Sequence, residues 1–183
     1  SSDVCSSDLI LMRKKKLNYI HGRAYADFPM INGQGLGEIS KMRYGLCRMS
    51  FNGCEVISVY NALVFLGIPE PIEEVADFME RYRVLAGIFG GNVYKTGRSL
   101  QHFGADFQKN TDLSCAEAFI VSYWTGKRFL SSIHTVFCER SGGKIKVYNR
   151  YNNYPSVQLC SNLETVTGRK KPIAVYAIKK EKK

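Results

Sequence analysis

Residues 54–66 place apolar side chains around most of the circumference of a helix. Asn52 before this run and Gly67 after it are typical of the start and the end of a helix. Polar residues interrupt the run only at every third position: Glu55, Ser58 and Asn61. So narrow a polar stripe is typical of a helix in the interior of a domain. The sequence therefore predicts a buried helix that begins near Cys54.

The second half of the chain has a different pattern, with short runs of β-branched and aromatic residues between turn residues. Four runs predict strands: AFIVSYWTG (118–126), SIHTVFCER (132–140), KIKVYNRYN (144–152) and PIAVYAIKK (172–180). A second helix is predicted over residues 71–83, and a short one over 161–168 with Ser161 as its cap and Glu164 completing a capping box. Helices first and strands later predict an α+β fold in which the buried helix packs on an antiparallel sheet.

The ends of the chain differ from this central domain, which we place at residues 44–178. Residues 12–43 are rich in glycine and predict an extended, loop-rich lead-in, and residues 179–183 form a basic tail. The chain opens with SSDVCSSDL, which looks like the translation of a sequencing adapter. We therefore expect residues 1–11 to be non-native, with Met12 as a candidate start.

Without Cys5, an odd number of cysteines with no regular spacing remains. This pattern argues against a disulfide framework and for reduced thiols, so we expect a cytoplasmic protein. The cysteines form no C-x-x-C pair and the three histidines are scattered, so we expect no metal and no cofactor.

The formal net charge is +10, and much of the basic character lies in short runs near the two ends of the chain. Such runs are typical of solvated tails, so we expect no specific nucleic-acid partner, although acidic partners or membrane surfaces would be favoured. No apolar run reaches the roughly 20 residues that cross a membrane.

Cys54 follows Gly53 in the expected first turn of the buried helix. The unpaired N–H groups and positive potential of a helix N-terminus favour a thiolate, so this position predicts a nucleophile. The alternative is that Cys54 is a small buried apolar residue, which is a common place for a free cysteine.

His134 and Asn149 lie on two successive runs that predict a hairpin. If residues 140–143 form a four-residue loop, Glu139 lies opposite Lys144 and His134 lies opposite Asn149, with Cβ atoms about 5 Å apart. A two-residue loop would keep both side chains on one face but offset them along the strands. In a Cys–His–Asn site the imidazole accepts the thiol proton and the asparagine orients the ring.

This order of a helix-start cysteine, then a histidine and an asparagine on adjacent strands, resembles the papain-like cysteine peptidases, and most closely the bacterial C39-like group. The resemblance rests on NGCEVISVYNALVFLG, GIFGGNVYKTGRSLQHFG, SIHTVF and KIKVYNRYNN, and covers about residues 44–178. It implies that Cys54 is the nucleophile, His134 the general base and acid, and Asn149 the orienting residue. At the third position the C39 group more often has aspartate, whereas papain has asparagine.

The oxyanion hole departs from the family pattern. Papain-like enzymes usually have a glutamine a few residues before the nucleophile, and here the nearest glutamine is Gln34, twenty positions upstream of Cys54. We therefore name the backbone N–H of Cys54 as one oxyanion donor, with Asn52 or Ser50 as candidates for the second. Loss of one such donor typically costs about 10²–10³ in rate.

The resemblance implies a cysteine peptidase or amidase that acts on a peptide or protein substrate through a thioester. The likeness to the C39 group implies a leader peptide cleaved after small residues as one such substrate. Three alternatives stay open: an inactive papain-like module that binds peptides, a transglutaminase-like acyl transferase, and a basic nucleic-acid binder. The sequence predicts neither the substrate nor the oligomeric state.

Overall fold

The computed structural model describes residues 6–109, 113, 116–126 and 132–180. Its first half is mainly helical: α1 (Ser6–Gly22), α2 (Met49–Asn52), α3 (Cys54–Leu66), α4 (Ile72–Met79) and α5 (Thr96–His102). Short 3-10 turns lie between them at Arg23–Tyr25, Glu38–Lys41, Glu80–Tyr82, Leu85–Gly87 and Val93–Lys95. A two-stranded sheet, β1 (Arg43–Tyr44) and β2 (Cys47–Arg48), precedes α2.

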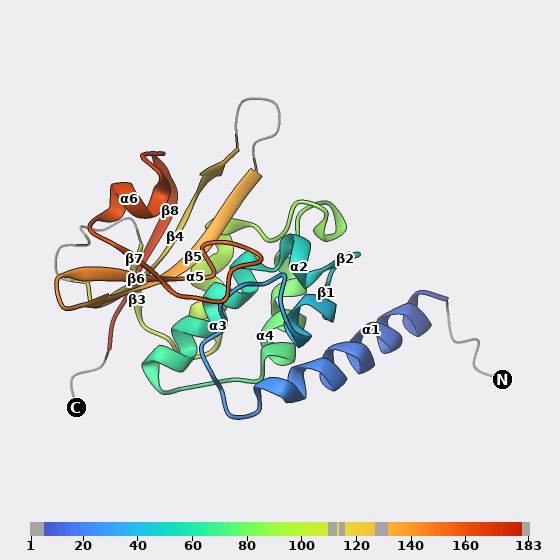
Figure 1. Cartoon of the computed structure of the whole chain (residues 1–183). Helices are drawn as coiled ribbons and strands as arrows, with labels where there is room; N and C mark the ends of the chain where they lie inside the picture. Colours follow the sequence, from blue (N-terminus) through green and yellow to red (C-terminus); the bar gives the residue numbers. More distant parts are fainter. Residues whose placement is uncertain (1–5, 110–112, 114–115, 127–131, 181–183) are drawn as a thin grey trace.

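The second half forms a six-stranded antiparallel sheet in the order β3-β8-β4-β5-β6-β7. Its strands are β3 (Phe107–Lys109), β4 (Ala118–Thr125), β5 (Ser132–Ser141), β6 (Lys144–Tyr148), β7 (Gln158–Cys160) and β8 (Pro172–Ile178), and α6 (Leu163–Thr167) lies before β8. Each of the four predicted runs coincides with one of these strands, although β5 extends one residue beyond its run, to Ser141. The α+β prediction is confirmed, with the helices of the first half gathered on one side of the sheet (Figure 1).

The hydrophobic core lies on both faces of the sheet. On one face, α3 residues such as Val56 and Leu63 pack in one cluster with Ile120 of β4 and Phe137 of β5. On the other face, Val121 of β4 belongs to a second cluster together with residues of β5–β7 and α6. The prediction that the Cys54 helix is buried against the sheet is confirmed, because nine of its residues are buried.

The hairpin between β5 and β6 has a shorter turn than the four-residue loop that we assumed. Ser141 pairs directly with Lys144, and Gly142 and Gly143 form the turn with φ of +57° and +75°. Two consecutive residues with positive φ make a turn that glycine adopts readily. The register therefore opposes Glu139 to Lys146, and His134 is not directly opposite Asn149.

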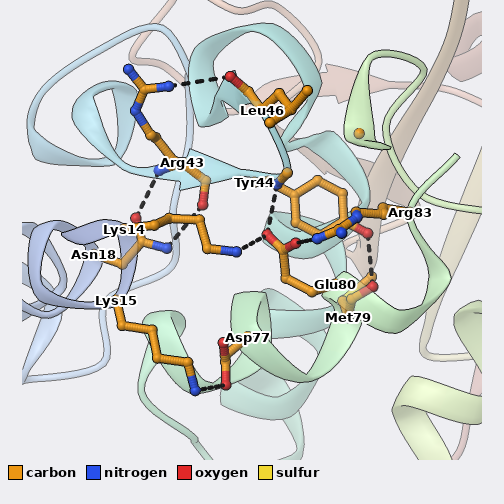
Figure 2. Close-up of polar contacts among 12 residues, drawn as sticks. Lys14, Lys15, Asn18, Arg43, Tyr44, Leu46, Asp77, Met79, Glu80 and Arg83 are labelled. Atoms are coloured by element: carbon orange, nitrogen blue, oxygen red, sulfur yellow. Dashed lines mark hydrogen bonds and ion pairs between the residues drawn. The ribbon is translucent and has the colours of Figure 1, made fainter. Parts of the chain in front are cut away.

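The lead-in is not extended throughout, because helix α1 continues to Gly22. Polar contacts attach α1 to the body of the domain (Figure 2). Lys14 forms an ion pair with Glu80 at 2.8 Å, and Lys15 forms one with Asp77 at 2.9 Å. The side chain of Asn18 donates a hydrogen bond to the carbonyl oxygen of Arg43 and accepts one from its backbone N–H. The Lys14–Glu80 pair is largely buried, with side chains 10% and 11% exposed.

Helix α6 has a different cap from the predicted one. Asn162 is the cap, and Thr165 instead of Glu164 completes the capping box. No helix among the described residues is both long and apolar enough to cross a membrane.

Candidate active site

Cys54 is the first residue of α3, at a sharp junction with α2. Gly53 forms the junction, and a Cβ atom there would overlap the side chain of Met49, which is fully buried. Only glycine fits at this close approach, so the residue before the cysteine is set by packing. We predicted that Asn52 caps α3, but Asn52 is the last residue of α2. The N-cap position of α3 is Gly53.

Cys54 as a residue is half-buried, and its thiol is buried beside Thr135 of β5. Burial raises its pKa to about 11, and the charge of Glu55 adds to this, while hydrogen bonds from the backbone and hydroxyl of Thr135 act in the opposite direction. The prediction that the helix start lowers this pKa is therefore wrong. Desolvation of the sulfur outweighs the helix terminus, so Cys54 is a neutral thiol at pH 7.

His134 is held by a backbone carbonyl. Its Nε2 lies 2.7 Å from the carbonyl oxygen of Asn149. Because a carbonyl only accepts, Nε2 of the neutral ring carries the proton and Nδ1 keeps its lone pair. Burial lowers the pKa of His134, opposed by hydrogen bonds to the backbone of Asn149 and Arg150. The ring is therefore a neutral base, and no described residue donates a hydrogen bond to its Nδ1.

The His134 ring and the Cys54 thiol point to different faces of β5. Thr135, beside the thiol, and Phe137 point to the α3 face of the sheet, whereas His134 alternates to the other face, where its ring meets Tyr123 edge-on at 6.1 Å between centroids. No hydrogen bond joins Cys54 Sγ to His134 among the described residues. The structure therefore brings Cys54 beside Thr135, the residue that follows His134 in β5, but does not bring the thiol and the imidazole into contact.

The side chain of Asn149 bonds to Gln34 instead of His134. Asn149 Oδ1 accepts from the backbone N–H of Gln34 at 2.8 Å, and Asn149 Nδ2 donates to Gln34 Oε1 at 2.9 Å. Both side chains are buried, at 0% and 1% exposure. The predicted contact between the carboxamide and the imidazole is replaced by one from the Asn149 carbonyl. Gln34, which spacing alone placed too far away, is part of the site.

The three candidate oxyanion groups differ in whether they have a hydrogen-bond donor available. Asn52 Nδ2 donates to the carbonyl oxygens of Tyr44 and Gly87, so both of its hydrogens are used and it is not an available donor. Ser50 contributes its carbonyl oxygen as an acceptor for Gln34 Nε2 at 3.1 Å. The N–H of Cys54 lies in the first turn of a helix, where N–H groups lack partners within the helix.

Glu55, next to the nucleophile candidate, is a buried carboxyl that sequence reasoning treated only as part of a polar stripe. Its Oε1 accepts from the Thr96 hydroxyl at 2.6 Å, and burial raises its pKa to about 7. The backbone at Gly91 lies close against the Glu55 carboxyl, because a Cβ atom on Gly91 would overlap Glu55 Oε2. A glutamate inside an apolar helix is the sequence signal for this group.

No cluster of three or more His, Cys, Asp or Glu side chains within the described residues could hold a metal ion. In comparisons with known proteins, no family model, no curated protein and no solved structure matches the chain.

Proposed function

We propose that this protein is a cysteine-dependent hydrolase of peptide or amide bonds with a papain-like arrangement, in which Cys54 is the nucleophile and His134 the general base and acid. The observation that carries this proposal is the meeting of four distant parts of the chain at the start of α3. Cys54 lies beside Thr135, His134 is the next residue along β5, and Asn149 and Gln34 adjoin them.

The protonation pattern of His134 supports this assignment. A base for Cys54 needs one nitrogen with a free lone pair and a partner that holds the other N–H. The Asn149 carbonyl holds Nε2–H, which leaves Nδ1 for the thiol proton. The tautomer is therefore the productive one, although a main-chain oxygen and not a carboxamide selects it.

The reaction requires the His134 ring, whose Cβ lies on the sheet face away from α3, to reach Cys54 around the edge of β5. The β5–β6 pairing ends at Phe137 and Tyr148, so no strand among the described residues pairs with the β6 side of β5 at His134 and Thr135. Side-chain rotation is fast compared with enzyme turnover, and catalytic contacts are often long in sites without a substrate. Once the ring contacts the thiol, proton transfer from Cys54 to His134 forms an ion pair. A paired thiolate costs less free energy in a buried place than an isolated one.

The chemistry follows from these groups. His134 Nδ1 takes the Cys54 proton as Sγ attacks the substrate carbonyl, and the N–H of Cys54 donates to the developing oxyanion. Collapse of the tetrahedral intermediate breaks the C–N bond, and His134 returns the proton to the leaving amine. Water, deprotonated by His134, then cleaves the thioester and restores the thiol.

Digestion of a complex peptide library, read by mass spectrometry of new termini, tests this function. Wild-type protein is expected to generate new termini, and Cys54→Ala and His134→Ala are each expected to reduce their rate of formation at least about 10³-fold. Cys47→Ala, which removes another free, half-buried cysteine, serves as a matched control that retains most activity. New termini formed equally by Cys54→Ala would contradict the proposal.

A second function, peptide binding without catalysis, is favoured by the raised pKa of Cys54 and by the absence of a Cys54–His134 hydrogen bond within the described part of the chain. In that case no termini appear, and peptides captured from the same library bind Cys54→Ala as well as wild type. Transfer of the acyl group to an added amine instead of water would indicate the acyl-transferase alternative.

A further inference from the structure

We infer that Gln34 is a positioning residue that sets the distance between the Cys54 helix and the His134 strand by clamping Asn149 to α2. This inference rests on the proposed function for its catalytic meaning. The clamp itself is a matter of contacts among Gln34, Asn149 and Ser50.

The backbone N–H, the side chain and the carbonyl of Asn149 all form hydrogen bonds. Its backbone N–H donates to Asn32 Oδ1 at 2.6 Å, its side chain forms the two hydrogen bonds with Gln34, and its carbonyl accepts from His134 at 2.7 Å. Its φ is +56°, in the left-handed region that asparagine tolerates better than most residues. The carbonyl that holds the imidazole is therefore oriented by the residues that hold Asn149.

Gln34 connects Asn149 to the cysteine side of the site. Its Nε2 donates to the carbonyl oxygen of Ser50 in α2, at 3.1 Å, and Ser50 lies four residues before Cys54. Asn152, in the segment after β6, donates to the same oxygen at 3.2 Å. One buried amide side chain thus joins the segment that holds His134 to the helix that precedes Cys54, and in Figure 1 the chain after β6 returns toward α2 and α3.

The clamp explains why residue 149 is asparagine in this chain. Asparagine accepts from the Gln34 N–H and donates to Gln34 Oε1 at once. An aspartate could only accept, so it would leave Gln34 Oε1 facing a second acceptor in a buried place. A carboxamide that contacted the imidazole directly would not have this requirement, because aspartate orients a histidine equally well in many catalytic sites.

The experiment measures the pKa of His134 by NMR titration of its ring in the full chain, together with kcat/KM where hydrolysis is detected. Gln34→Met keeps the side-chain volume and removes the amide. We expect the His134 pKa to rise by about half a unit or more toward its ordinary value as the clamp loosens and water reaches the ring, and kcat/KM to fall about 10–100-fold. Asn149→Asp is expected to lower kcat/KM by a similar factor.

Asn61→Ala is the matched control. Asn61 is an equally buried amide that clamps the same segment through the N–H and carbonyl of Ile31, at 2.8 and 2.9 Å, without contacting Asn149. It is expected to lower stability and to leave the His134 pKa unchanged. Gln34→Asn, which keeps an amide on a shorter side chain, repeats the measurement if Gln34→Met does not fold.

Two results would overturn the inference: a His134 titration in Gln34→Met identical to wild type, or an equal shift in Asn61→Ala, which would indicate general loosening. The double variant Gln34→Met with Asn149→Ala is expected to shift the His134 pKa no further than either single change, and additive shifts would also contradict the clamp. A chain that hydrolyses nothing while the titrations behave as expected would refute the proposed function and leave the clamp standing.

Discussion

At the residue scale, burial decides the chemistry of the groups around α3 more than the helix terminus does. Cys54 and Glu55 occupy the first turn, yet desolvation raises the pKa of the thiol to about 11 and that of the carboxyl to about 7. The dipole of a helix terminus stabilises a nearby charge by at most a few kcal/mol, and removal from water costs more. At pH 7 the site therefore holds a neutral thiol and a neutral imidazole, and Glu55 becomes a neutral carboxyl only as the pH falls below about 7.

Glu55 makes stability depend on pH. Its folded pKa of about 7 lies above the ordinary 4.5, so the folded state binds the extra proton between these values. Stabilisation is complete below about pH 4.5 and is lost as the pH rises through 7, by roughly 3 kcal/mol for a shift of this size. Urea unfolding at pH 5 and pH 8 should show this loss in wild type and not in Glu55→Gln. An identical pH dependence in both proteins would contradict the assignment.

Single residues were also the hardest to place from the sequence. Cys54, His134 and Asn149 could be named from their types and spacing, but the partner of Asn149 could not. Gln34 lies 115 positions from Asn149, and nothing in local spacing reports a contact between two loops. The face on which His134 lies depends on strand alternation, whereas its contact with a backbone carbonyl depends on where the chain turns after β6.

At the element scale, periodicity predicted α3 and the long strands well because their apolar positions face a core. It missed short elements with few residues to average over, such as β3 and β7, and it missed α1. Helix α1 has a weak apolar stripe, and most of its large apolar side chains are exposed, among them Ile10, Met12 and Tyr19. The hairpin register depended on the length of the turn, which the sequence RSGG left open between two and four residues.

The hydrogen bonds of Asn18 hold helix α1 on the domain more strongly than the exposed Lys15–Asp77 ion pair does. Asn18→Ala leaves both the N–H and the carbonyl of Arg43 without their partner, at 2.7 and 2.8 Å in the native chain, and is expected to cost about 2 kcal/mol. Lys15→Ala removes an exposed pair with Asp77 and is expected to cost less than about 1 kcal/mol. Urea unfolding compares the two, and equal costs would contradict this view of the interface.

At the scale of the whole molecule, the lead-in forms hydrogen bonds to both halves of the domain. Residues 31–35 cross from Asn61 of α3 to Asn149 after β6, and they bond to both. The two halves of an α+β fold therefore meet through a segment that the sequence predicted only as an extended connection. In the clamp that we infer, Gln34 of this segment sets the distance between the Cys54 helix and the His134 strand.

The central claim is that Cys54 and His134 act on one acyl group, and acetylation by p-nitrophenyl acetate tests it without knowledge of the natural substrate. Intact-mass and peptide mass spectrometry would follow acetyl transfer to Cys54 and its hydrolysis over time. We expect acetyl-Cys54 to form and turn over in wild type, to be lost in Cys54→Ala, and to hydrolyse about 10²–10⁴-fold more slowly in His134→Ala. Acetylation spread over Cys47 and surface lysines, with the same turnover in all three proteins, would contradict the account.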